Sequence, residues 1–298
     1  MMASTQNSTN LVGSLSVGHT MSYPEAFHDA LRAKEQALCL LNSALGSMAS
    51  ADVDAILAAV LLLIGFELID SGRGSWVFHI NGARMITEKL MESGSGKRTA
   101  FSPLRRCNNF YMFPDTSINL GLHDTLRLLD AAKSFDPAAW ATSLQPRSPA
   151  DDLLHRTMVA CAHRTAVCVY LSRIILALWP NAVLSDDLQV LAAEIITHLS
   201  HLHPGDALFT ATAWPAFVAG LETRGLASRT WVERRFQELW KVEPWGFTRE
   251  ALGALRTMWD ERKKGFLLTT SDDEFYGGEE DWNWIKRLKS LGADWLIA

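Results

Sequence analysis

Apolar side chains recur at helical spacing along most of the chain. The first stripe begins after Pro24 and closes at Gly46, and its members are Phe27, Leu31, Leu38, Leu41 and Leu45. Positions three and four apart share one face of an α-helix, so the stripe predicts an amphipathic helix. Asp52 can cap the next helix, whose apolar face from Val53 to Leu68 is too wide for a helix that faces solvent. We therefore expect this second helix to lie centrally in the fold.

The same spacing predicts two more helices before residue 180. Ser75 can cap the first, which carries on one side Trp76, His79, Ala83, Ile86 and Leu90. A longer helix has apolar positions from Val159 to Leu178 and ends at Trp179-Pro180. Because its apolar positions extend over several turns, it is expected to contribute to the core.

The C-terminal part continues the pattern. Ser185 can cap a strongly amphipathic helix over 188–202. Further helical blocks are predicted at 206–224, 228–241, 248–264 and 280–291, the last of them stopped by Gly292. No block of alternating β-branched residues competes with these helices. The sequence therefore predicts an all-α fold, an irregular bundle of about 9–12 helices.

Three stretches lack this periodicity. Residues 1–22 are rich in Ser, Thr, Asn and Gly and are predicted to form a disordered tail. Residues 93–119 have few periodic apolar positions and are predicted to be a linker or long loop. A second break is expected at 145–152, where two prolines stop the preceding element. We therefore place one domain over 23–298, with a loop or sub-boundary near 93–150.

Composition places the chain among ordered globular proteins. Of its 298 residues, 48% are apolar and 20% are charged, which excludes disorder as the main state. The net charge of −5 argues against a chain whose own field holds a polyanion. The N-terminal residues lack the basic and apolar regions of a signal peptide. The uncharged stretch Ala55–Phe66 is shorter than the about 20 residues that a bilayer requires. Neither secretion nor a membrane span is expected.

Cysteine and histidine spacing bears on metal binding. The cysteines are Cys39, Cys107, Cys161 and Cys168. None of them forms a C-x2-C pair, so no zinc motif is predicted and we expect reduced, buried thiols of an intracellular protein. His198, His201 and His203 lie close in sequence, but favourable charge at a helix C-terminus is preferred to zinc, because no fourth ligand stands nearby at ligand spacing. The sequence therefore predicts no metal and no cofactor in this chain.

The chain has no recognised catalytic motif. Gly94-Ser95-Gly96-Lys97 resembles a phosphate loop only in part, because Met91 replaces the first glycine and Arg98 the magnesium-binding hydroxyl. The chain has no G-x-S-x-G, H-E-x-x-H, Rossmann or kinase signature. His79 beside Trp76 is interpreted as a packed or hydrogen-bonded core histidine. The sequence therefore predicts no catalytic residues.

Several blocks in a fixed order resemble a known family. They are FHDALRAKEQALCLLNSAL, DVDAILAAVLLLIGFELIDSGRGSWVFHINGARMI, HRTAVCVYLSRIILAL, WPAFVAGLETR, RTWVERRFQELW, WGFTREALGALRTMWDER and LGADWLIA. Together they cover most of residues 25–298. They resemble the regulatory domain of fungal binuclear zinc cluster transcription factors of the acriflavine sensitivity control type. The family-like positions include Trp76, His79, Trp214 and Arg224. Packing is the preferred role of the two tryptophans.

The resemblance implies a transcription-regulatory domain in the nucleus. The family's DNA-binding module, an N-terminal six-cysteine cluster with two zinc ions, has no counterpart in this sequence. Zinc is therefore expected only if such a cluster exists upstream, and this chain alone is not expected to bind DNA sequence-specifically. Three explanations stay open: a chain that begins after the module, a shortened gene model, or a protein that naturally keeps only the regulatory domain.

We therefore predict a domain that responds to an effector or a partner and is not an enzyme. A helical domain with wide apolar faces can close around a small effector or present a groove to a helix of another transcription protein. The sequence does not identify the residues of such a site, the oligomeric state or the effector. One alternative is an enzyme of unknown chemistry, suggested by nine histidines and eleven tryptophans that can line a cavity. The other alternative is a degenerate remnant of such a domain, which would be poorly folded and would have no activity.

Overall fold

A computed structural model describes most of the predicted helical part of the chain. The described residues are 23–46, 53–70, 77–83, 85, 121–144, 152–269 and 282–290. The predicted tail at 1–22, the predicted loop at 93–119 and the predicted stop at Gly292 lie outside them. The chain divides into two units, Met1–Ile56 and Leu57–Ala298.

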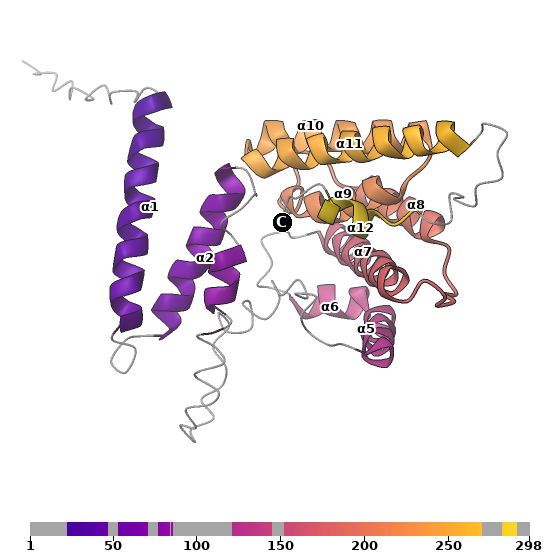
Figure 1. Cartoon of the computed structure of the whole chain (residues 1–298), viewed down its shortest axis with the longest axis horizontal. Coiled ribbons are helices and arrows are strands. Elements are labelled where there is room, and N and C mark those ends of the chain that lie inside the picture. Colours follow the sequence, from indigo (N-terminus) through magenta and orange to yellow (C-terminus); the bar gives the residue numbers. More distant parts are fainter. Residues whose placement is uncertain are drawn as a thin grey trace, which may run out of the picture. The chain divides into compact units, whose positions relative to one another are not determined.

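The first unit contains helix α1, which spans Tyr23–Gly46 (Figure 1). The predicted start at Pro24 and end at Gly46 are thereby confirmed to within one residue. The Cys39 thiol is exposed, so the prediction that the cysteines are buried was wrong at this position. Cys39 follows Leu38 by one residue, which places it about 100° around the helix from the leucine stripe.

Helix α2 spans Val53–Asp70 and has the wide apolar face that the sequence predicts. Its buried apolar residues are Ile56, Val60, Leu63, Ile64 and Leu68. A short helix follows at residues 77–83, where His79 Nε2 lies 3.4 Å from Glu67 Oε1. Both side chains are largely buried, so this contact ties the short helix to α2. The central position of α2 stays a prediction.

Two helices lie within the stretch 93–150. Helix α5 spans Leu122–Ser134 and α6 spans Pro137–Ser143. Asp136 caps α6, because its Oδ1 accepts the amides of residues 138 and 139 at 2.9 and 3.0 Å. Pro137 takes the first helical position, where its missing N–H leaves no hydrogen bond unmade. Part of the stretch is therefore regular structure, and the sub-boundary stays a prediction.

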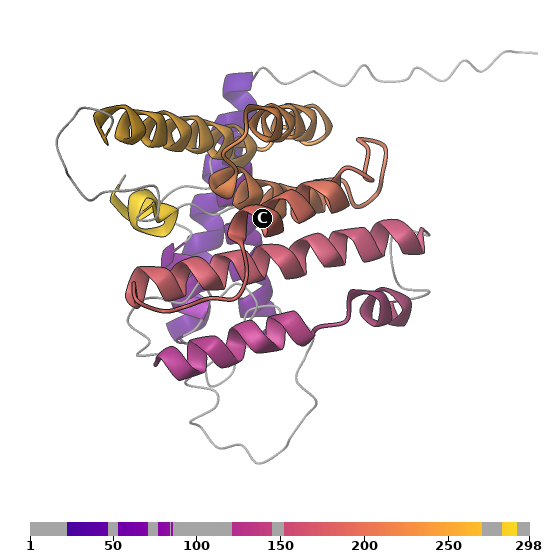
Figure 2. The same ribbon diagram turned by 90° about the vertical axis from the view of Figure 1, so that its right-hand side faces the viewer.

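Helix α7, Leu153–Leu178, is the long core helix of the bundle and ends at Trp179 as predicted. Figure 2 shows α5 and α6 along one side of it and α8 along the other. Leu129 of α5 packs there on Cys168 and Ile175. By length and composition α7 can cross a membrane, but 56% of its most apolar stretch is buried inside the structure. Its hydrophobicity is therefore that of a packed core helix.

Helix α8 spans Leu188–Leu199, and its cap differs from the predicted one. Asp187 Oδ1 accepts the amide of Gln189 at 2.8 Å, whereas the Ser185 hydroxyl donates to Asp186 at 3.3 Å. Ser185 was therefore the wrong cap, because the free amides of a helix are reached from the residue just before it. The predicted caps Asp52 and Ser75 lie outside the described residues.

Helix α9 is the centre of the bundle. A short 3-10 turn, Thr210–Thr212, leads into α9, Ala213–Glu222, where a helix over 206–224 was predicted. Every residue of α9 except Trp214 is buried. The helix packs against α7 and α8 and also against the two helices that follow it. A helix that is apolar on all sides needs such a position.

Helices α10, Leu226–Val242, and α11, Gly246–Thr269, pair with each other and cover α9. Helix α12, Trp284–Ser290, packs on α7. The predicted blocks for these helices agree with the observed bounds to within about five residues, as is usual for helix ends. In all the ranges that the structure describes, the regular elements are helices and no strand occurs, so the predicted all-α class is confirmed.

Gly220 provides a test of the packing around α9. A Cβ at this position would lie 2.9 Å from Leu255 Cδ2 and 2.9 Å from Val232 Cγ1. We expect Gly220→Ala to lower the free energy of unfolding by about 1–3 kcal/mol, because overpacking forces α9 away from α10 and α11. Urea denaturation of the two proteins measures this difference.

Gly253→Ala on α11 is the matched control. Gly253 is exposed, and a Cβ there meets nothing within 4 Å. Alanine should leave the free energy of unfolding unchanged or raise it by up to about 1 kcal/mol, because alanine has the higher helix propensity. Equal losses in both variants would contradict the close contact at Gly220.

Candidate functional site

Helix α9 ends in a buried acid. The Glu222 side chain is 0% exposed and is the one buried carboxylate among the described residues of α5–α12. The C-terminal end of a helix carries partial negative charge and free carbonyl groups. A carboxylate buried at this end is therefore unfavourable unless cations and hydrogen-bond donors surround it.

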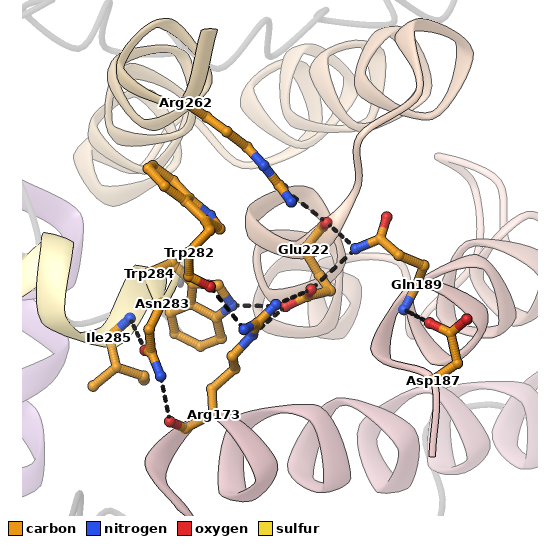
Figure 3. A network of polar contacts seen from close by, with 9 residues as sticks. All are labelled: Arg173, Asp187, Gln189, Glu222, Arg262, Trp282, Asn283, Trp284 and Ile285. Atoms are coloured by element: carbon orange, nitrogen blue, oxygen red, sulfur yellow. Dashed lines mark hydrogen bonds and ion pairs between the residues drawn. The ribbon is translucent and has the colours of Figure 1, made fainter. Parts of the chain in front are cut away.

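The carboxylate receives donors from three other helices, α7, α8 and α12 (Figure 3). Arg173 of α7 pairs with it through two nitrogens: Nε donates to Oε2 at 2.8 Å, and Nη2 donates to Oε1. Trp284 of α12 donates its indole Nε1–H to Oε2 at 3.0 Å. Such a fork fixes both the distance and the orientation of its two helices. The ion pair thus connects α7 with α9, and the indole adds α12.

The free carbonyls at the end of α9 are also satisfied by side chains. Gln189 Nε2 of α8 donates to the Glu222 carbonyl at 2.6 Å and lies 3.0 Å from Oε1. Arg262 Nη1 of α11 donates to the same carbonyl at 3.2 Å. Two residues earlier, the Gly220 carbonyl accepts Trp259 Nε1–H at 2.8 Å. Side chains from α8 and α11 therefore cap the end of α9.

Arg173 also holds the start of α12. Its Nη1 donates to the Trp282 carbonyl at 2.7 Å, and its own carbonyl accepts Asn283 Nδ2–H at 2.8 Å. Asn283 Oδ1 in turn accepts the amide of Ile285 at 3.0 Å. We call these contacts the Glu222 network, and it joins α7, α8, α9, α11 and α12 (Figure 3). Its members are Arg173, Gln189, Glu222, Arg262, Trp282, Asn283, Trp284 and Ile285.

Chemically, the Glu222 network is suited to holding helices together. Its carboxylate accepts several hydrogen bonds and faces a cation, and the members drawn in Figure 3 include no hydroxyl or thiol that could act as a nucleophile.

A second buried arginine, Arg235, also donates hydrogen bonds to carbonyl groups near the end of a helix. Arg235 Nη2 donates to the Leu199 and Leu202 carbonyls after α8 at 2.9 and 3.1 Å. Burial lowers the pKa of Arg235 to about 10.

Arginine–aromatic contacts give several tryptophans a structural role. The pairs are Arg229 over Trp259, Arg235 over Trp231, Arg249 over Trp240, and Arg262 and Arg287 over Trp282. The guanidinium carbons lie 4.8–5.9 Å from the ring centroids, within the range of cation–π attraction. These tryptophans therefore serve helix packing.

The family-like positions fall in different surroundings. Trp76 lies outside the described residues, and His79 contacts Glu67. Trp214 stacks on His163 of α7 with a centroid distance of 5.7 Å. Arg224 is exposed just after α9. The packing role preferred for Trp214 agrees with this stacked contact, and His79 is hydrogen-bonded as expected.

The three clustered histidines do not converge on one point. His198 Nδ1 lies 3.4 Å from the Met158 sulfur, and burial lowers the pKa of His198, whereas His201 and His203 are exposed. The backbone amide of His203 donates to Asp206. In the parts that the structure describes, no group of three or more metal-ligating side chains is assembled. The absence of a metal stays a prediction, and Gly94–Lys97 lies outside the described residues.

Sequence reasoning missed the members of the Glu222 network. For two of them the signal is a charge that follows a run of uncharged residues: Glu222 after WPAFVAGL and Arg173 after TAVCVYLS. A charge in the middle of a buried helix requires a partner. The partner itself cannot be read from spacing, because 49 residues separate the two.

Fold and site together define the class: an all-α domain whose buried charges cross-link its helices. A family model described as "Fungal specific transcription factor domain" matches residues 1–137 and 122–298. The Acriflavine sensitivity control protein acr-2 of Neurospora crassa is 27% identical, in an alignment that covers 94% of this chain and 57% of that protein. The chain thus spans little more than half the length of this relative. No solved structure matches the chain.

The chain belongs to the fungal specific transcription factor domain family, since the model matches it from end to end. The resemblance noted from the sequence blocks is thereby confirmed, and so is a role in transcription regulation at the level of the family.

Glu222→Gln tests the network. The substitution keeps the shape of the side chain but leaves the Arg173 guanidinium without a buried counter-charge. We expect it to lower the free energy of unfolding by about 3–5 kcal/mol. Chemical denaturation followed by circular dichroism measures the loss.

The control uses an ion pair at the surface of α10. Arg234 Nε lies 3.0 Å from Glu238 Oε1, and the arginine side chain is 76% exposed. Glu238→Gln should cost no more than about 0.5 kcal/mol, because solvent screens the pair. An equal loss of unfolding free energy in both variants would show that the buried Glu222 ion pair stabilises the fold no more than the surface pair does.

Metal content tests the interpretation of the three histidines. After dialysis at neutral pH, the purified chain should carry no stoichiometric zinc, because structural zinc needs four ligands and the described residues assemble no such set. A chelator should leave the thermal unfolding midpoint unchanged. One tightly held zinc per chain, lost when His198, His201 and His203 are changed to alanine, would contradict this prediction.

Proposed function

We propose that the chain is an effector- or partner-responsive regulatory domain of a fungal transcription factor, acting in the nucleus. The observation that carries the proposal is the family match over both halves of the chain. The chain spans 57% of its relative's length, and the proposal gives it no sequence-specific contact with DNA. The net charge of −5 supports this part of the proposal.

The Glu222 network supports the responsive part of the proposal. When one member of a buried polar network moves, the groups that it leaves lose their hydrogen bonds, and the folded state is strongly destabilised. Helices joined in this way are expected to move as one unit, because displacing one of them breaks hydrogen bonds to the others. Binding of an effector or a partner helix at one of the five joined helices would therefore alter the others. The proposal includes no resident cofactor and no membrane.

The enzyme alternative has less support. It needs two titratable groups in a cavity, and the described bundle pairs His155 Nδ1 with Asp206 Oδ1 at 2.9 Å. Their side chains are 23% and 21% exposed. The second Asp206 oxygen accepts the backbone amide of His203. This geometry is that of a surface ion pair that holds the loop after α8 against α7.

A reporter assay tests the regulatory function. The full chain, fused to an unrelated DNA-binding domain in a yeast strain, should change transcription of a reporter severalfold relative to that DNA-binding domain alone. A fusion that carries Gly253→Ala should behave like the wild-type fusion, because that position is open and exposed. An abundant, folded fusion without any effect on the reporter would contradict the proposal.

The unfused chain controls for direct DNA contact. In a mobility-shift assay with duplex DNA it should bind weakly, and binding should be lost between about 50 and 200 mM salt. A sequence-specific complex that survives at the higher salt would place DNA recognition in this chain.

A further inference from the structure

Buried cations outnumber buried anions in the bundle. Among the described residues of α5–α12, one carboxylate, that of Glu222, is buried. The buried guanidiniums are those of Arg156, Arg173, Arg235 and Arg262. Arginine keeps its charge in proteins, so each of these groups needs an anion, carbonyl oxygens or aromatic faces around it.

Three of these arginines have such surroundings. Arg173 pairs with Glu222, and Arg262 donates to the carbonyl of the same residue. Arg235 donates to two carbonyls after α8, and its guanidinium carbon lies 4.7 Å from the centroid of the Phe209 ring. Their charges are therefore accommodated within the fold.

Arg156 differs from the other three. It is 2% exposed, and within the described part of the chain its Nε and Nη2 atoms have no hydrogen-bond partner. Arg235 and Arg262 also have two such nitrogens each, but each of them donates hydrogen bonds to carbonyl oxygens through the third nitrogen. Asp152 lies one turn earlier on α7, but its Oδ1 accepts the amides of residues 154 and 155 at 2.8 and 3.2 Å as the helix cap. The amide hydrogen bond from His155 is the largest cause that lowers the pKa of Asp152, and the charge of Arg156 is the smallest. Asp152 therefore serves the helix end.

The same face of α7 continues with aromatic side chains. His163 and Tyr170 follow Arg156 at intervals of seven residues, which is two helical turns. His163 stacks on Trp214, and the Tyr170 ring lies 6.5 Å from Trp214 and 6.1 Å from Trp284. Burial lowers the pKa of His163, so its ring is neutral at physiological pH. Beyond Arg156, this face therefore carries rings that are packed on tryptophans, and His163 Nε2 also lies 2.8 Å from the Ala211 carbonyl oxygen.

We propose that Arg156 anchors a binding site for an oxyanion, a carboxylate or phosphate group carried by a small effector. The planar fork of a guanidinium matches two oxygens of either group. The proposal rests on the effector-responsive function proposed above and adds the chemical class of the effector.

The test uses inorganic phosphate and benzoate as probes of the two oxyanions. Thermal unfolding of the full chain is followed at neutral pH in sodium chloride, phosphate and benzoate of equal ionic strength. For the wild type we expect phosphate or benzoate to raise the unfolding midpoint by several degrees over chloride, with the dependence on concentration of a saturable site. A response to benzoate alone assigns a carboxylate, and a response to phosphate alone assigns a phosphate.

Three variants separate binding from general salt effects. Arg156→Met should lose the anion-dependent rise and keep or exceed the wild-type midpoint in chloride, because it removes an unmatched buried charge. Arg156→Lys keeps the charge but loses the fork, so it should fold and respond more weakly. Arg164→Met, at a half-buried arginine of the same helix, should respond like the wild type.

Two outcomes would overturn the proposal. One is an equal rise with phosphate or benzoate in all four proteins, which is the general stabilisation that excluded anions give. The other is a lower midpoint of Arg156→Met in chloride together with an unchanged anion response, which would make Arg156 a purely structural residue. Neither outcome affects the reporter assay, so failure of this proposal and failure of the regulatory function are distinguishable.

Discussion

The bundle depends on one carboxylate that is buried at the C-terminal end of a helix, where a negative charge is unfavourable. Glu222 closes α9, where the helix dipole and the free carbonyls are both negative. Only a cation and several N–H donors can make that position stable. They come from four other helices: Arg173 from α7, Gln189 from α8, Arg262 from α11 and Trp284 from α12. The relative placement of these five helices therefore follows from the hydrogen-bonding needs of a single residue.

The same constraint explains why this all-α core is rich in arginine and tryptophan. Packing helices end-on into a core buries their last carbonyls, which must then find donors. Long side chains with several N–H groups can reach them across a helix pair: Arg235 serves α8, and Trp259 serves α9. Their flat surfaces also stack, as in Arg229 over Trp259. Arginine and tryptophan are therefore needed mainly where a buried helix end has carbonyl groups that require a donor.

Local sequence signals predicted the helices, and long-range contacts lay beyond them. The bounds of α1 and the end of α7 follow from periodicity, Gly46 and Pro180. The cap of α8 was missed because Ser185 and Asp187 are both good caps and only the backbone path chooses between them. The Glu222 network was not predicted because its contacts between helices join residues that lie 33 to 110 positions apart. Spacing rules describe neighbours on one helix and give no information about such distances.

Helix α7 carries two buried arginines in opposite situations. Arg173, near its C-terminal end, is fully committed to Glu222 and to the start of α12. Arg156, in its first turns, has two guanidinium nitrogens without a hydrogen-bond partner in the described part of the chain, and its charge is only the smallest of the causes that lower the pKa of Asp152. A charge left unmatched costs stability, so the folded protein gains free energy when an anion arrives there. Helix α7 is continuous and packs on α5, α6, α8 and α9. In our proposal, an anion bound at its first turns therefore acts on the same helix that the Glu222 network holds at the other end. The proposed effector response requires both parts: a binding site, and a cross-link between the helices that surround it.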